Sequence, residues 1–208
     1  MITNDTRFQL ALAKFDAANA QDPNQEVFEG KTYPKELIYA QRMTAMLAKF
    51  APDATEAVQL ASRCQHICRW KSPRNAYPMD GVGYKQWRTA LYKFHGETAG
   101  AIMREVGYDD EMISKVQALL RKEKLKVNPE TQMLEDVVDL VFLQHYLADF
   151  VTKYSHYEEE KLLGILRKTW RKCPITAMLQ HSNSNTRRRY WRSSRKPWQA
   201  IKFLKFII

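Results

Sequence analysis

The apolar residues of this chain recur at spacings of three and four, and this periodicity constrains the fold more than any other feature. Two examples are the sets Met43, Met46, Leu47, Phe50 and Ile113, Val116, Leu119, Leu120. Such spacing places apolar side chains on one face of an α-helix. No segment alternates apolar and polar residues in the manner of a half-buried strand. The pattern predicts an all-α protein.

Proline, glycine and capping residues divide the chain into successive helices. The first predicted helix covers residues 7 to 20, and the second starts at Pro34. The third runs from a capping box of Asp53 and Glu56 to near Trp70, and the fourth runs from about Tyr84 to Val106. The fifth starts at Asp109, the sixth starts at Asn128, and the seventh covers residues 159 to 170. Gly107 is the expected stop of the fourth helix, and the segment KSPRNAYPMDGVG at 71 to 83 is an expected loop. Short connections predict a single-domain bundle of about seven helices.

The net charge of +10 is concentrated at the C-terminal end of the chain. Ten of the 33 basic residues follow position 170, where no acid occurs, so the remaining 23 match the 23 acids. We therefore predict a helical domain over residues 1 to 172 and a basic tail over residues 173 to 208. The tail is the only part expected to attract nucleic acid or an anionic membrane. An atypical splice or a gene-model error is the alternative origin of this tail.

Several classes of protein are excluded by composition and motif. No apolar run approaches the roughly 18 to 20 residues of a membrane helix, and the N-terminal apolar stretch is interrupted by charges, so no secretory signal is expected. Three cysteines without zinc-like spacing predict neither a disulfide framework nor a zinc finger. The chain also lacks the paired ATP-binding motifs of an aminoacyl-tRNA synthetase. We expect a cytoplasmic protein.

Three expected helices each carry a candidate metal ligand: His66, His95 and Asp136. Histidine and carboxylate groups suit a divalent metal such as Mn, Fe, Mg or Zn, which activates water for attack on phosphorus. Glu97 and Glu135 are the candidate catalytic carboxylates. A helical histidine is more often a packed, hydrogen-bonded side chain. Asp136, inside the apolar segment LEDVVDLVF, is explained equally well by a buried ion pair with an arginine.

Basic and aromatic side chains are interleaved around the first histidine. The candidate substrate-binding residues are Arg63, Arg69, Arg74 and Arg88, with Lys71, Lys85, Trp70, Tyr77, Tyr84 and Trp87 between them. Guanidinium groups match phosphate oxygens, and aromatic faces stack on bases, so a nucleotide or another phosphorylated small molecule is the expected ligand. The alternative is that the arginines pair with acids of the domain while the aromatic rings pack in the core.

A series of motifs resembles the domain of unknown function 4202 family over about residues 5 to 172. These motifs are DPN, PKELIYAQRMT, QLASRCQHICRW, PRNAYPMDGVGYKQWRTALYKFH, GY, LEDVVDLVFL and ILRKTW. The stretch from QHICRW to WRTALYKFH is the most specific part. That family has no settled activity, so the resemblance implies no mechanism. After KTW the chain departs from the usual continuation of the family.

The arrangement also resembles, more distantly, the HD-type metal phosphohydrolases. These α-helical proteins carry a first ligand histidine on one helix, an adjacent His-Asp pair on a later helix and a distal aspartate. The resemblance implies that His66 is the first histidine, His95 the second and Asp136 the distal aspartate. Gly96 stands at the position of the paired aspartate, and Glu97 is rotated about 100° further around the helix. One ligand of the resembled set is therefore missing.

Two functions of different classes follow from these patterns. The first is an HD-like, metal-dependent phosphohydrolase acting on a nucleotide or phosphorylated small molecule. The second is a non-catalytic helical module that binds a ligand or a protein through the arginine-rich segment. In either case we expect His66, His95 and Asp136 to converge in one polar pocket with Arg69 and Arg74 at its rim, because buried polar groups need partners.

Overall fold

The computed structural model describes residues 4–153 together with residues 160 and 164. By its internal contacts the chain divides between Leu134 and Glu135 into two units, and each is described by itself. The tail predicted over residues 173 to 208 lies outside the described residues, and so does most of the helix predicted over 159 to 170. None of the helices within the described ranges is long and apolar enough to cross a membrane.

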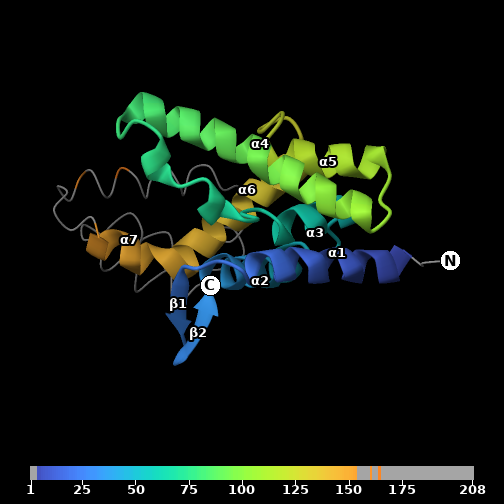
Figure 1. Ribbon diagram of the computed structural model, residues 1–208, viewed down its shortest axis with the longest axis horizontal. Coiled ribbons are helices and arrows are strands. Elements are labelled where there is room, and N and C mark those ends of the chain that lie inside the picture. Colours follow the sequence, from blue (N-terminus) through green and yellow to red (C-terminus); the bar gives the residue numbers. More distant parts are fainter. Residues whose placement is uncertain (1–3, 154–159, 161–163, 165–208) are drawn as a thin grey trace, which may run out of the picture. The chain divides into compact units, whose positions relative to one another are not determined.

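The first unit is built almost entirely of helices, as the apolar spacing predicts. Its α-helices are α1 (Asn4–Asn19), α2 (Lys35–Phe50), α3 (Glu56–Arg63), α4 (Gly81–Glu105) and α5 (Asp110–Leu120), with the short 3-10 helices η1 (Arg69–Lys71) and η2 (Arg74–Ala76) between α3 and α4. Helix α3 packs against α1, α2 and α5, while α4 runs beside α5 and also contacts α1 (Figure 1). Side chains without exposed surface fill the space between them, among them Phe15, Met43, Leu60, Ile67, Met103 and Leu120.

Helix α6 (Pro129–Val141) begins in the first unit and ends in the second. The second unit continues with a π-helical turn, η3 (Phe142–Tyr146), and with α7 (Leu147–Lys153). The described residues thus contain seven α-helices, and the prediction of an all-α fold is confirmed. The cap expected at Asn128 is also confirmed, because its side-chain oxygen accepts the backbone N–H of Glu130 at 2.9 Å.

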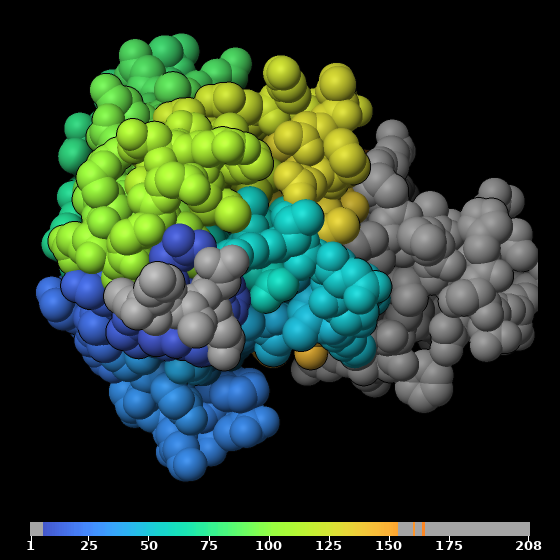
Figure 2. Space-filling model, turned by 90° about the vertical axis from the view of Figure 1, so that its right-hand side faces the viewer, coloured from blue at the N-terminus to red at the C-terminus, as the bar shows by residue number. Residues whose placement is uncertain are grey.

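A small hairpin between α1 and α2 was not predicted by periodicity. Strand β1 (Gln25–Phe28) pairs antiparallel with β2 (Lys31–Pro34), and Glu29 and Gly30 form the turn at positive φ angles of 49° and 75°. Such angles are typical of two-residue hairpin turns. The hairpin projects from the helical body of the first unit (Figures 1 and 2). Four-residue strands are too short to produce a recognisable alternation.

Two predicted helix boundaries around α5 are confirmed by their cap geometry. The side chain of Asp109 accepts the backbone N–H of Met112 at 2.8 Å, which satisfies a donor at the start of α5. Gly107 follows the end of α4 with a φ of 87°, a conformation that glycine adopts without steric cost. The connection between the two helices is therefore encoded locally.

The predicted start of α3 is wrong by a few residues. A turn closed by the Ala54 N–H and the Ala51 carbonyl, at 3.0 Å, occupies the segment that contains Asp53. Thr55 therefore takes the N-cap position instead of Asp53, and its side chain makes no cap hydrogen bond. The Thr55 hydroxyl donates to Glu130 at 2.6 Å. A contact distant in sequence replaces the expected capping box.

The predicted end of α3 is wrong by almost two turns. The helix stops at Arg63 instead of continuing to near Trp70, and residues 64 to 68 form consecutive turns. The buried side chain of Asn19 accepts the backbone N–H of Cys68 at 3.0 Å, and Cys68 has the left-handed φ of 53°. A tertiary hydrogen bond therefore stabilises a backbone conformation that cannot continue a right-handed helix.

Candidate functional site

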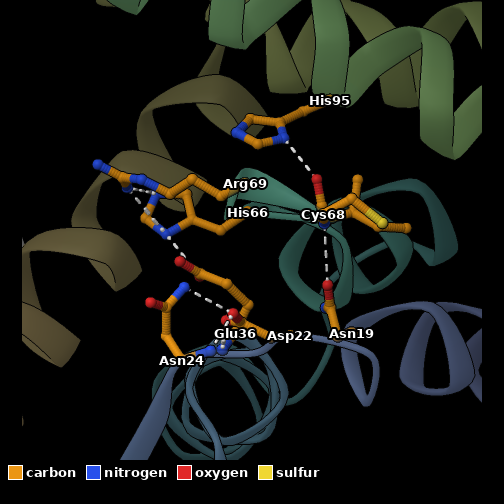
Figure 3. A network of polar contacts seen from close by, with 9 residues as sticks. Asn19, Asp22, Asn24, Glu36, His66, Cys68, Arg69 and His95 are labelled. Atoms are coloured by element: carbon orange, nitrogen blue, oxygen red, sulfur yellow. Dashed lines mark hydrogen bonds and ion pairs between the residues drawn. The ribbon is translucent and has the colours of Figure 1, made fainter. Parts of the chain in front are cut away.

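The structure brings His66 and His95 together, as the sequence predicts. His66 lies in the turns that follow α3, and His95 lies in the middle of α4. Their ring centroids are 5.9 Å apart with an interplanar angle of 32° (Figure 3). We call the group formed by Glu36, Tyr39, His66, Arg69 and His95 the histidine cluster.

The orientation of the His95 ring is fixed by a backbone carbonyl. Its Nδ1–H donates to the Ile67 carbonyl at 2.8 Å, and the early end of α3 frees this carbonyl from helical pairing. The Nε2 atom therefore bears the lone pair, and it is buried without a hydrogen-bond partner among the described residues. Burial, together with the neighbouring His66, lowers the pKa of His95 to about 3. His95 thus presents a neutral, unpartnered acceptor nitrogen.

His66 makes contacts on three sides. Its ring stacks on Tyr39 of α2 with centroids 4.2 Å apart, and its Nδ1 lies 3.4 Å from Oε2 of Glu36. The Nη1 group of Arg69 lies 3.0 Å from Nε2 of His66 and 3.3 Å from Nδ1. Arg69 therefore contacts both ring nitrogens, of which Nε2 is the nearer, while Glu36 faces Nδ1. Burial and the adjacent Arg69 charge lower the pKa of His66 well below its ordinary value.

Glu36 is a member of this cluster that sequence reasoning missed. It is buried in the first turn of α2, one turn before Tyr39 on the same face of the helix. Burial raises the pKa of its carboxyl group to about 7, although the Arg69 charge acts in the opposite direction. In the segment PKELIYAQ an acid after proline is the ordinary sign of a helix start. The sequence therefore gives no signal of this role.

Two buried polar residues at the C-terminal end of α1 and just after it hold the cluster in position. Asp22 accepts the backbone N–H groups of Asn24 at 2.9 Å and of Glu36 at 3.0 Å, so it fixes the start of α2. Asn19 fixes the turn at Cys68, as described above. Both side chains are visible below the histidines in Figure 3. The DPN motif is thus a structural support for Glu36.

Of the four predicted substrate-binding arginines, Arg69 joins the cluster and Arg74 has a local role. Arg69 contacts His66, and its guanidinium carbon lies 5.1 Å from the Trp87 ring centroid. No carboxylate within the described residues lies at ion-pair distance from Arg69. Arg74 donates to the backbone carbonyls of Tyr77 at 3.1 Å and Asp80 at 3.2 Å. These contacts hold the loop before α4.

The other two arginines have side-chain partners. Arg63 forms a two-pronged pair with Asp16, at 2.7 and 2.5 Å, and also donates to Thr44 at 3.2 Å. This is the structural ion pair that the alternative interpretation expects. Arg88 donates to the hydroxyl of Tyr92 at 2.5 Å, and Tyr92 precedes His95 by one turn of α4. The Arg88 charge also lowers the pKa of the partly buried His66.

Of the three predicted carboxylates, Glu97 is the one that lies in the same unit as the histidines. Glu97 has 62% of its side chain exposed and pairs with Lys93 at 3.8 Å, because two residues of helix rotate it by about 200° from His95. The structure does not bring it to the histidines. Glu135 and Asp136 belong to the second unit, where Asp136 is buried and both have partners. The assignment of Asp136 as a metal ligand stays a prediction.

Gly96, the position of the missing aspartate, faces α5. Its carbonyl accepts the side-chain amide of Gln117 at 3.1 Å, and a Cβ atom there would lie 3.7 Å from Gln117. One turn later, a Cβ atom on Gly100 would lie only 2.5 Å from the same amide. Gly100 therefore leaves room for the Gln117 side chain, whereas position 96 would accommodate a Cβ atom in ordinary contact. A side chain at position 96 would point toward α5.

Comparison with known families gives a membership but no activity. A family model described as a domain of unknown function, DUF4202, matches residues 9–182. The chain belongs to this family. No curated protein and no solved structure matches the chain. Within the described residues, no group of three or more His, Cys, Asp or Glu side chains is arranged to hold a metal ion.

Proposed function

We propose that the histidine cluster is the site of a metal-dependent phosphohydrolase acting on a nucleotide or another phosphorylated small molecule. The observation that carries the proposal is the Nε2 atom of His95. It is buried, bears a lone pair and has no hydrogen-bond partner in the described part of the chain. Burying such an atom without a partner is costly, and functional sites are where proteins accept that cost.

The residues present fit a divalent metal in two respects. Ligand histidines are neutral and commonly donate their second ring N–H to a carbonyl or a carboxylate. His95 donates to the Ile67 carbonyl, and Nδ1 of His66 faces Glu36. The low pKa values keep both rings neutral at physiological pH. A metal held there would lower the pKa of a bound water and polarise a phosphoryl group.

The protein residues have separate tasks in this proposal. Glu36 and Tyr39 orient the His66 ring through its Nδ1 atom and its face. Arg69 contacts Nε2 of His66, the nitrogen that a metal would use, so ligation by His66 requires Arg69 to withdraw. Its planar group of donors then becomes available to phosphate oxygens, which guanidinium binds well.

The same Arg69 contact favours one alternative function. If Arg69 stays on Nε2 of His66, the histidine is part of a closed polar network and not a ligand. The chain is then a non-catalytic module that binds a phosphorylated ligand or a protein without a metal. The presence or absence of metal-dependent hydrolysis distinguishes the two functions.

The test is phosphate release by the full chain, purified, treated with a chelator and reloaded separately with Mn, Fe, Mg or Zn. The substrates are nucleoside phosphates and sugar phosphates. We expect metal-dependent release that falls at least about a hundredfold in His66→Ala and in His95→Ala. His145→Gln, which changes a partly buried histidine of the second unit, is the matched control. Asp136→Asn tests the sequence-based assignment of that residue in the same assay.

Two results would contradict the proposal. Release that persists unchanged in His66→Ala, with an unchanged helical circular dichroism spectrum, would assign this histidine to packing. Absence of release with every metal and substrate would leave the non-catalytic module as the function.

A further inference from the structure

The segment between α5 and α6 contains three lysines in an unusual backbone conformation. Lys122, Lys124 and Lys126 have φ angles of 57°, 53° and 79°. Residues other than glycine, asparagine and aspartate rarely adopt this left-handed region, because Cβ crowds the backbone. The three lysines differ in burial, since Lys122 is partly buried whereas Lys124 and Lys126 are exposed. Lys122 is therefore the one that is turned toward the protein.

The ammonium group of Lys122 lies on the side of α4 that carries His95. Its Nζ is 5.5 Å from the centroid of the Tyr92 ring, and Tyr92 precedes His95 by three residues on the same helical face. The guanidinium carbon of Arg88 is 5.1 Å from the same ring centroid. Two cations from different parts of the chain thus share one aromatic ring.

Positive charges lie around both histidines. The Nη1 atom of Arg69 is 3.0 Å from Nε2 of His66, and Arg88 and Lys122 lie against the ring of Tyr92, one turn before His95. The charges of all three act in the same direction on the partly buried His66. Glu36 contacts His66 on the Nδ1 side, at 3.4 Å. Arg88 and Lys122 also make further contacts. An anion would therefore be attracted by the positive charge gathered there, whether or not these side chains have free N–H donors.

We propose that Arg69, Arg88 and Lys122 form a subsite for a phosphate group beside the two histidines, with Lys122 presented by the left-handed turn after α5. The arginines offer planar donor groups that match phosphate oxygens, and the lysine adds a point charge. A bound anion would offset the mutual repulsion of the three cations. The identity of the ligand as a phosphorylated molecule rests on the proposed function. The role of Lys122 does not follow from the sequence.

The left-handed backbone at Lys122 allows this residue to be replaced by glycine without strain. Glycine adopts positive φ without steric cost, so Lys122→Gly preserves the turn and removes only the side chain. Lys124→Gly makes the same change two residues away, at nearly the same φ and on an exposed side chain. Neither variant should melt below the wild-type temperature. The probe is inorganic phosphate, titrated calorimetrically into the metal-free full chain.

We expect the wild-type chain to bind phosphate, Lys122→Gly to bind at least about tenfold more weakly, and Lys124→Gly to bind within about twofold of wild type. Absence of phosphate binding by the wild-type chain, or equal weakening in both variants, would overturn the subsite. The outcome is separable from that of the proposed reaction. Phosphate binding that depends on Lys122 in a chain without hydrolytic activity supports the subsite and refutes the reaction. Metal-dependent hydrolysis with unaltered kinetics in Lys122→Gly supports the reaction and refutes the subsite.

Discussion

Two of the polar clusters in the first unit offer a useful comparison, because each combines a glutamate, an arginine and an aromatic ring. One is the histidine cluster. The other, the tyrosine cluster, consists of Arg7, Glu56 and Tyr108. In the tyrosine cluster the hydroxyl of Tyr108 donates directly to Glu56, and the Arg7 guanidinium lies 4.4 Å from the centroid of the Tyr108 ring. The carboxylate therefore has a donor in direct contact.

The histidine cluster is less well satisfied. The nearest ring nitrogen of His66 is 3.4 Å from Glu36, the pKa of the buried Glu36 is raised to about 7, and Nε2 of His95 has no partner among the described residues. The two clusters differ in their carboxylates, because Glu56 accepts directly from Tyr108 whereas the contact of Glu36 with His66 is longer. We assign a function to the histidine cluster because its polar groups also have strongly shifted pKa values.

The largest expected difference between the clusters concerns the pH dependence of stability. The pKa of His95 is about 3 in the folded chain against 6.5 for an unperturbed histidine, and that of His66 is also lowered. Below pH 6.5 the unfolded chain binds protons that the folded chain excludes. Each histidine thus reduces the free energy of unfolding by up to about 1.4 kcal/mol per pH unit as the pH falls. Glu36 acts in the opposite direction, because its raised pKa makes the folded chain retain a proton between about pH 7 and pH 4.5.

Replacing Glu36 by glutamine should therefore make the acid sensitivity steeper. Between pH 6.5 and 4.5 we expect the free energy of unfolding of Glu36→Gln to fall by about 1.4 kcal/mol more per pH unit than that of the wild type. Urea unfolding at several pH values measures both slopes. Identical slopes in the two proteins would show that Glu36 does not retain a proton in the folded state.

A matched pair of substitutions compares the two clusters at a fixed pH. At pH 8, Glu56→Gln should cost about 1 kcal/mol, because a charge-assisted hydrogen bond with Tyr108 becomes a neutral one. Glu36→Gln should cost nothing or increase stability, because it removes a carboxyl group that burial disfavours in its charged form. Chemical denaturation of the three proteins tests this prediction. An equal loss in both variants would mean that the clusters do not differ.

The smallest expected effect concerns the face of α4 that packs against α5. Gly96→Ala should change stability by less than about 1 kcal/mol, because its Cβ would make an ordinary contact at 3.7 Å and alanine favours helix. Gly100→Ala should be destabilising, because its Cβ would lie 2.5 Å from the Gln117 amide. Thermal unfolding distinguishes the two variants. Gly96→Asp should not increase metal content, since position 96 faces α5.

The helices could be predicted from the sequence because their signals are local. Gly107 and Asp109 mark the connection between α4 and α5 within a few residues, and both assignments are confirmed. The end of α3 could not be predicted in this way, because the Asn19 side chain, 49 residues from Cys68, stabilises the turn there. Because the helix ends early, the Ile67 carbonyl has no helical partner and accepts the ring N–H of His95.

The candidate site could also be predicted only in part. The pairing of His66 with His95 follows from their places on neighbouring elements, and the sequence predicted it. Glu36 and Lys122 were not predicted, because each looks like an ordinary helix-start acid or loop lysine. Burial in the folded chain distinguishes Glu36 from the exposed acids, and partial burial distinguishes Lys122 from Lys124 and Lys126, which share its left-handed backbone.

The most direct test of the central claim is the metal content of the full chain, purified without added metal and measured by elemental analysis in wild type and His95→Gln. Glutamine can still donate an amide N–H to the Ile67 carbonyl, but it lacks the buried ring nitrogen. We predict about one metal ion per chain in the wild type and almost none in the variant, with equal helical content. Equal metal content in the two proteins, or none in either, would contradict the assignment of His95 as a ligand.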